Sequence, residues 1–100
     1  MPYEAFHERS ELLPGGTGKI HRAIISLIEE FEAIDWYNQR IEVCEDKMLR
    51  RILIHNRDEE KVYAAMLLEW IRRHDDGFST ELQEYLFTEK AIAEHELFKK

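Results

Sequence analysis

The sequence lacks any long apolar run, and this absence argues against a helix that spans a membrane. Such a helix needs roughly 18 or more consecutive apolar residues, whereas charged side chains interrupt every apolar stretch of this chain. The N-terminus also lacks the apolar centre of a signal peptide, because Glu4, Glu8 and Arg9 are charged. We therefore expect a cytoplasmic protein without a membrane partner.

Basic residues are also scarce. The 14 lysines and arginines are outnumbered by 21 aspartates and glutamates, which gives a formal net charge of −7. Proteins that bind nucleic acid use a basic surface to displace the counterions of the phosphates. No basic stripe of that kind is present in the sequence, so we expect no nucleic-acid partner.

Cysteine occurs once, at Cys44, so the chain cannot form an internal disulfide. This is typical of a protein of the reducing cytoplasm. With 100 residues, the chain makes one small domain whose core is only marginally large enough to be stable alone. Internal repeats and the strict alternation of apolar and polar residues that is typical of strands are also absent. The expected fold class is all-α.

Two long segments have the apolar periodicity of a helix. The first follows residues 14–18, which we interpret as a Pro/Gly hinge, and Thr17 is its expected N-cap. Its period predicts a helix of about 26 residues that ends at Val43. The apolar residues that recur every three or four positions are Ile20, Ile24, Leu27, Phe31, Ile34 and Ile41.

The second long segment begins after Asp46, which is its expected N-cap, and ends near His74. Gly77 is expected at the C′ position that follows the helix. The two segments predict a pair of antiparallel helices. The seam of the second segment alternates steps of four and three residues and consists of Leu49, Leu53, Asn56, Glu60, Tyr63, Leu67 and Trp70.

Shorter helical segments are expected after Gly77. Thr80 begins a capping-box pattern that predicts a helix over residues 80–87, and Thr88 is the expected N-cap of an amphipathic piece that reaches Leu97. We therefore divide the chain into an N-terminal segment with its hinge (1–18), a helical hairpin domain (19–90) and a helical tail (91–100).

The two long helices carry an apolar seam that is too wide for one hairpin to bury. Two hairpins that pair across a two-fold axis would form a four-helix bundle and cover this seam. We therefore expect a homo-oligomer whose smallest unit is an obligate dimer.

Each long segment also places a glutamate on its buried side. In the first segment Glu30 shares a face with apolar residues, whereas Glu29 and Glu32 turn away from that face. In the second segment Glu60 lies on the seam, and Tyr63 follows one turn later. A carboxylate that is removed from water without a partner costs several kcal/mol or takes up a proton. These two glutamates therefore need an explanation.

A dimer would bring two copies each of Glu30 and Glu60 to one interface. Four carboxylates cannot share a dry space without cations, and hard divalent metals prefer carboxylate oxygens. We therefore expect a site for two metal ions, with iron as the best fit and other divalent metals as substitutes. The alternative is that the two glutamates pair with Arg57, Lys61 or Arg72 of a neighbour.

Several runs of the sequence closely resemble the encapsulated ferritins, and the resemblance spans residues 20–90. The runs are EEFEAIDWY at 29–37, HNRDEEK at 55–61, AAM at 64–66, EW at 69–70, RR at 72–73 and YLFTE at 85–89. The resemblance implies a ferritin-like helical hairpin with a short further helix. It also implies that dimers build a di-iron site and assemble into an annular decamer inside an encapsulin shell.

The resemblance further implies a ferroxidase that converts Fe(II) to Fe(III) and passes it to the encapsulin shell for storage, inside a nanocompartment of the cytoplasm. By motif position, it implies that Glu30 and Glu60 are the bridging and chelating ligands and that Tyr37 is a weak ligand nearby. Glu29 and Glu32 would be carboxylates of an outer site on the path of the incoming iron, close to Trp36.

The sequence departs from the family at Tyr63, where the family has histidine, so each iron loses an imidazole nitrogen. Tyr63 remains a candidate catalytic and metal-binding residue, because a ferric ion can stabilise a phenolate. The change predicts slower oxidation or tighter retention of the product. The given sequence ends in HELFKK at 95–100, without the Gly/Ser-rich linker and the apolar targeting peptide that are usual in the family, so packaging is implied by the resemblance alone and not by these residues.

Three functions from different classes remain open at this point. The first is a ferroxidase with a di-iron site at a dimer interface. The second is a non-catalytic metal-binding relative, in which loss of the histidine has left a sequestering site. The third is a helical oligomerisation module without metal. Iron-dependent oxygen consumption separates the first from the second, and metal content separates both from the third.

Overall fold

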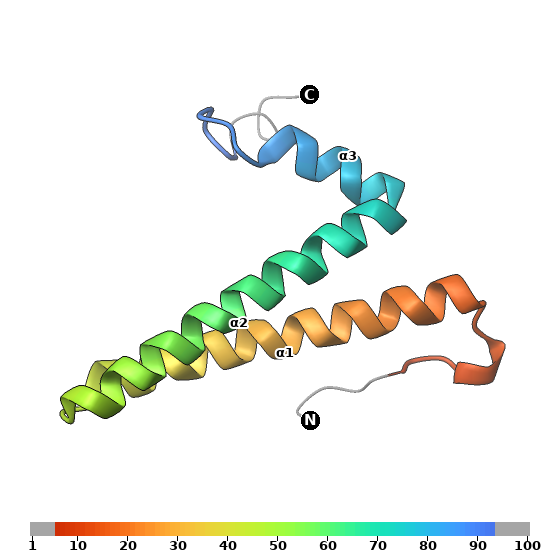
Figure 1. Ribbon diagram of the computed structural model, residues 1–100. Helices are drawn as coiled ribbons and strands as arrows, with labels where there is room; N and C mark the ends of the chain where they lie inside the picture. The colour runs from red at the N-terminus through yellow and green to blue at the C-terminus, as the bar shows by residue number, and fades with distance from the viewer. Residues whose placement is uncertain (1–5, 94–100) are drawn as a thin grey trace.

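The computed structural model describes residues 6–93, which form three α-helices (Figure 1). A 3₁₀ turn, Ser10–Leu12, precedes α1 (Gly15–Val43), α2 (Lys47–His74) and α3 (Asp76–Tyr85). No strand occurs within this part of the chain, and the predicted all-α class is confirmed. None of the helices in residues 6–93 is both long enough and apolar enough to cross a membrane.

α1 and α2 form the predicted antiparallel hairpin, and α3 turns away from the far end of α2 (Figure 1). Asp46 caps α2 as expected, because its Oδ1 accepts a hydrogen bond from the Leu49 amide at 2.8 Å. At the same turn, Arg50 Nε donates to the Ile41 carbonyl at 3.2 Å. The Ile41 carbonyl also accepts a hydrogen bond from the Cys44 amide at 3.4 Å, so Arg50 gives it a second donor and ties the two long helices together where they meet.

α1 begins earlier than the sequence predicts. Pro14, with φ −60° and ψ 153°, is the N-cap, and the Gly18 amide donates to its carbonyl at 3.0 Å. Residues 15–18 are therefore helical, so the predicted hinge and the predicted N-cap at Thr17 are both wrong. The fixed φ of proline is compatible with a helix start, and a glycine costs only about 1 kcal/mol relative to alanine inside a helix.

α2 ends where the sequence predicts, but the following segment differs. Asp75, with φ −141°, ends α2 and also caps α3, since its Oδ1 accepts a hydrogen bond from the Phe78 amide at 3.0 Å. Gly77 thus lies inside α3 and not at C′, and Thr80 is an interior residue whose hydroxyl donates to the Asp76 carbonyl at 3.1 Å. Because Asp75 makes the corner with a single extended residue, no glycine with positive φ is needed there.

The chain leaves α3 at Tyr85. Phe87 then has a positive φ of 58°, and the Thr88 hydroxyl donates to the Tyr85 carbonyl at 3.4 Å. Residues 88–93 are not helical, so the helix predicted from Thr88 to Leu97 is wrong over residues 88–93. Its remainder lies outside the described residues.

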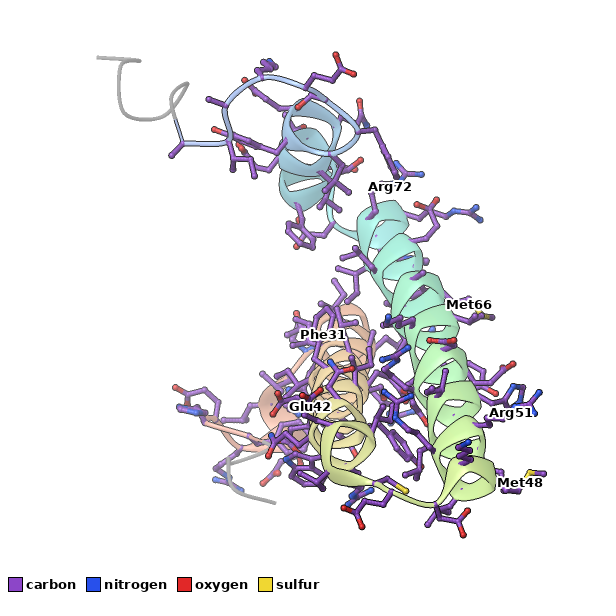
Figure 2. The ribbon with its side chains drawn as sticks, turned by 90° about the vertical axis from the view of Figure 1, so that its left-hand side faces the viewer. Phe31, Glu42, Met48, Arg51, Met66 and Arg72 are labelled. Carbon is purple, nitrogen blue, oxygen red and sulfur yellow. The ribbon has the colours of Figure 1, made fainter. Side chains whose placement is uncertain are left out.

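The single hairpin has a very small core. The radius of gyration of the chain is 17.5 Å, whereas a compact domain of this length has a radius of gyration of about 13 Å. Large apolar side chains are exposed, and Figure 2 shows Met48 and Met66 on the side of α2 that faces away from α1. A chain with so little buried surface needs further apolar contacts to be stable. Among the described residues, the buried ones are only Ala23, Ile41, Ala64 and Ile71.

Candidate metal centre

Glu30 and Glu60 meet between the two long helices. On α1, Glu30 lies on the inner stripe that also contains the buried residues Ala23 and Ile41. On α2, Glu60 lies one turn before the buried Ala64. Both glutamates are partly buried, and their carboxyl groups are within hydrogen-bonding distance of each other. The structure thus brings the two seam glutamates together within one chain.

This contact raises the pKa of the Glu30 carboxyl from 4.5 to about 7. The largest cause is the hydrogen bond with the Glu60 carboxyl, and burial and the negative charges of Glu60 and Glu29 act in the same direction. A bond between two carboxyl groups requires a proton on one of them, so the Glu30 carboxyl keeps its proton to a higher pH than an ordinary glutamate. A bound cation would remove the same repulsion and displace that proton.

One oxygen of this pair is left without a donor. Glu30 Oε2 is inaccessible to water and has no hydrogen-bond partner among the described residues. When both carboxylates are ionised, Glu60 cannot donate a hydrogen bond to this oxygen, because neither group carries a proton. A buried acceptor without a donor costs about 1–3 kcal/mol. Hard divalent cations bind carboxylate oxygens, so this oxygen fits a metal ligand.

The two basic residues closest to Glu60 in the sequence are engaged elsewhere. Arg57 Nε donates to Asp58 Oδ1 at 3.2 Å, and Arg57 Nη1 donates to Asn38 Oδ1 at 3.1 Å. Lys61 Nζ lies 3.9 Å from the same Asp58 oxygen. Within one chain, therefore, the contacts of these two residues do not neutralise the glutamate pair.

The other residues predicted for the site do not join the pair within one chain. Tyr63 is one turn beyond the α2 glutamate and is 46% exposed. Tyr37 packs against Arg40, whose guanidinium carbon lies 5.4 Å from the centre of the tyrosine ring. Glu29 is exposed and Glu32 is partly exposed. Across residues 6–93 of a single chain, no three Asp, Glu, His or Cys side chains are grouped closely enough to hold a metal ion.

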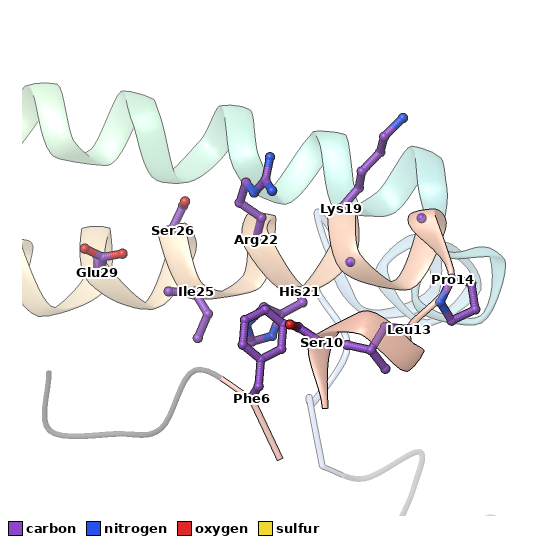
Figure 3. Close-up of a pocket in the computed structure, with 12 residues that line it drawn as sticks. Phe6, Ser10, Leu13, Pro14, Lys19, His21, Arg22, Ile25, Ser26 and Glu29 are labelled. Atoms are coloured by element: carbon purple, nitrogen blue, oxygen red, sulfur yellow. The ribbon is translucent and has the colours of Figure 1, made fainter. Parts of the chain in front are cut away.

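A cavity of about 620 Å³ lies beside the N-terminal half of α1 (Figure 3). Phe6 and His21 both line it, and their rings are tilted by 31° with the ring centres 4.2 Å apart. The sequence carries no signal for this cavity, because Phe6 precedes the first periodic segment. Glu29 is the single carboxylate among the lining residues. The cavity therefore lacks the oxygen donors of a hard-metal site, and the pair of Glu30 and Glu60 is the better candidate.

Comparisons with known proteins point to one family. The family model described as EncFtn-like matches residues 5–89. An encapsulated ferritin-like protein of Rhodospirillum rubrum is 54% identical over 86 residues, which make up 86% of this chain and 61% of the relative. A ferritin-like protein of Thermotoga maritima is 48% identical over 93 residues, which make up 93% of this chain and 82% of the relative.

A solved structure extends the similarity to the fold. The crystal structure of a protein from Nitrosomonas europaea superposes with a TM-score of 0.87 at 59% identity, over 90% of this chain and 99% of the other. The chain spans only 61% of the length of the R. rubrum relative. The similarity therefore says nothing about the rest of that relative.

Proposed function

Because the chain belongs to the EncFtn-like family, we propose that it is a ferroxidase, which binds Fe(II) as its substrate and oxidises it to Fe(III). The observation that carries this proposal is the pair of Glu30 and Glu60. It holds two carboxyl groups in contact, a proton that a cation can displace and a buried oxygen without a donor. A hard cation would neutralise the charge of this pair and bind the oxygen that has no donor, so its binding is favourable.

The proposed site is a di-iron site completed by a second copy of the chain. Within residues 6–93, one chain brings two carboxyl groups into contact and no larger group of metal-binding side chains, whereas two irons need more donors than this. A two-fold axis close to the pair would double it to four carboxylates and bring Tyr63 and Tyr37 of both copies to the same interface. In this arrangement Glu30 and Glu60 bind both irons, and the two tyrosines are weaker oxygen ligands.

The chemistry follows from holding two irons together. Each Fe(II) loses one electron, so two irons deliver two electrons to one dioxygen, which takes up two protons and leaves as hydrogen peroxide. The carboxylates favour this direction, because negative oxygen ligands stabilise Fe(III) more than Fe(II). Glu29, which is exposed, and Glu32, which is partly exposed, would attract the incoming Fe(II) before it reaches the inner pair.

We also propose that the assembly is a homo-oligomer built from dimers, with an annular decamer as the expected form and an encapsulin shell as its partner. The exposed apolar surface of the hairpin supports the first part. Similarity to the R. rubrum relative, an encapsulated ferritin-like protein, supports the second. Native mass spectrometry of the protein purified with a co-expressed encapsulin tests both parts.

Anaerobic titration of the metal-free protein with Fe(II), followed by admission of air, tests the proposed activity. Saturation at one iron per chain is expected, and each dioxygen consumed should account for two irons. Oxygen consumption no faster than that of the same Fe(II) in buffer would refute the ferroxidase. Absence of stoichiometric binding would refute the iron site itself and leave a helical oligomerisation module.

A second candidate is a metal-binding protein that sequesters iron without oxidising it. The observation that favours it is Tyr63, which stands one turn from Glu60, at the position where the resemblance to the family implies a histidine. A phenol is a poor neutral ligand for Fe(II), because its ordinary pKa is about 10. Stoichiometric Fe(II) binding without accelerated oxygen consumption would select this function.

A further inference from the structure

Arg57 has a position from which it could neutralise Glu60, yet it does not do so in the structure. It precedes Glu60 by three positions on α2, and this spacing places two side chains on one face of a helix within reach of each other. Arginine and carboxylate in such a position form an ion pair readily. The guanidinium instead binds Asn38 Oδ1 at 3.1 Å and Asp58 Oδ1 at 3.2 Å.

We propose that Asn38 and Asp58 form a latch that holds Arg57 away from Glu30 and Glu60 and so keeps this pair available to metal. The inference rests on the proposed function, because it concerns how tightly the same site binds metal. Asn38 and Asp58 are positioning residues in this account. They act through Arg57 and do not contact the metal.

The latch depends on Asn38, the residue of α1 that binds Arg57. Adjacent residues of a helix point in different directions and do not ordinarily face each other, so Asp58 alone is a poor partner for Arg57. Asn38 draws the guanidinium to the side of α2 where Asp58 can also reach it. The arginine side chain is only 24% exposed, so these two bonds fix its position against the hairpin.

The latch has an electrostatic consequence for the site. With Arg57 held aside by Asn38 and Asp58, both carboxyl groups of the pair remain available to a divalent cation. Asp58 also lies 3.9 Å from Lys61 Nζ, so one acid engages both cations that flank Glu60 in the sequence. A released Arg57 would form an ion pair with Glu60 and compete directly with the metal.

The test compares three variants of the full chain by calorimetric titration with Mn(II), a hard cation that air does not oxidise under these conditions. The double variant Asn38→Ala with Asp58→Asn should bind Mn(II) about fivefold more weakly, the size expected for a competing ion pair. Addition of Arg57→Gln to the double variant should restore native affinity. Arg57→Gln alone should bind Mn(II) at least as tightly as the native chain.

Rescue by Arg57→Gln separates the latch from a general structural role. A double variant with native affinity would overturn the proposal, and so would a weakened affinity that Arg57→Gln fails to restore. If the native chain binds neither Mn(II) nor Fe(II), the proposed function fails. The position of Arg57 is then tested separately, by a crystal structure of the double variant without metal. An Arg57 guanidinium that contacts Glu60 there supports the latch, and one that stays away from Glu60 overturns it.

Discussion

Glu30 is the residue at which the requirements of stability and of function oppose each other. Its pKa is raised to about 7 by the contact with Glu60, and one of its oxygens has no donor in the metal-free hairpin. Both features destabilise the folded, metal-free chain when the pair is ionised. Both also disappear when a cation binds, which is why the same carboxylate suits a metal ligand.

Replacement of either inner glutamate should abolish stoichiometric iron binding. Glu30→Ala and Glu60→Ala each remove one of the two carboxyl groups that meet between α1 and α2. Glu32→Ala should leave occupancy intact and change only the rate of uptake, since Glu32 lies outside the pair. Iron content per chain after anaerobic loading and desalting measures the difference, and Glu42→Ala, an exposed position on α1 (Figure 2), is the matched control. Equal occupancy in all these variants would contradict the assignment.

The metal-free protein should lose stability as the pH rises from about 4.5 to about 7. Over this window the folded chain still holds the Glu30 proton, because its pKa is raised from 4.5 to about 7, while the unfolded chain has released it. The free energy of unfolding therefore falls with pH through the window and levels off above it. Urea denaturation at fixed protein concentration, with a chelator present, measures the trend.

Glu30→Gln is the control for this pH dependence. It should flatten the profile and, above pH 7, raise the free energy of unfolding by about 1 kcal/mol, because an amide can donate a hydrogen bond to Glu60. A native profile that is identical to that of Glu30→Gln would show that the carboxyl pair has no influence on stability.

Tyr63→His should raise the rate of Fe(II) oxidation. The substitution places a neutral nitrogen donor one turn from Glu60 and completes a Glu-x-x-His pair of the kind used by di-iron helix bundles. The native protein should be the slower enzyme and should show a visible charge-transfer band from phenolate to Fe(III) after oxidation, which Tyr63→Phe removes. If Tyr63→His oxidises iron at the native rate and the native protein stays colourless, Tyr63 only packs at the interface.

At the scale of helices and turns, the corner between α2 and α3 is held by polar side chains. Arg72 donates two hydrogen bonds of 2.7 Å to Glu69 and one of 3.0 Å to Ser79 of α3. With Arg73 alongside, this bonding lowers the pKa of Glu69 to about 2. Within the chain, Arg72 therefore binds Glu69 and Ser79 at the corner between α2 and α3. It does not pair with Glu30 or Glu60 of the same chain, and pairing with these glutamates of a neighbour was the alternative that the sequence left open.

Asp75→Ala should loosen α3 without affecting the hairpin. It removes the side-chain cap on the Phe78 amide, at a cost of about 1 kcal/mol. Hydrogen exchange should therefore accelerate over residues 76–85 and stay unchanged over α1 and the first half of α2. Asp75→Asn keeps the capping oxygen and should behave like the native chain. Native exchange rates in Asp75→Ala would rule out the cap.

The sequence predicts the hairpin well, because helical period and the Asp46 cap are local signals. The inward position of Glu30 and Glu60 follows from the same period. The sequence does not predict the starts of α1 and α3, because Gly and Thr signal a helix start at residues 17 and 80 whereas Pro14 and Asp75 are the N-caps in the structure. The bond between Arg57 and Asn38 joins residues 19 positions apart, and it depends on a hairpin register that no local pattern specifies.

At the scale of the whole molecule, the hairpin is an incomplete structure. The radius of gyration of the chain is 17.5 Å, which exceeds the value of about 13 Å for a compact chain of this length. On α1, Ile24, Ile28 and Phe31 are exposed beside the Glu30 position, and on α2 so are Val62 and Tyr63. Exposed apolar surface on both long helices favours an interface with a second copy of the chain.

Assembly and metal binding should consequently be coupled. The native protein should be a dimer or a multiple of dimers at micromolar concentration, and divalent metal should favour the larger form because it cancels the repulsion between interface carboxylates. Phe31→Asp adds a further negative charge to this surface and should yield a monomer that no longer binds iron stoichiometrically, whereas Phe31→Leu keeps the apolar contact and should retain both properties. Light scattering and iron content, measured on the same samples, test the coupling. A native monomer, or a Phe31→Asp monomer with full iron occupancy, would show that one chain completes the site alone and that the two-fold interface is not the place where iron binds.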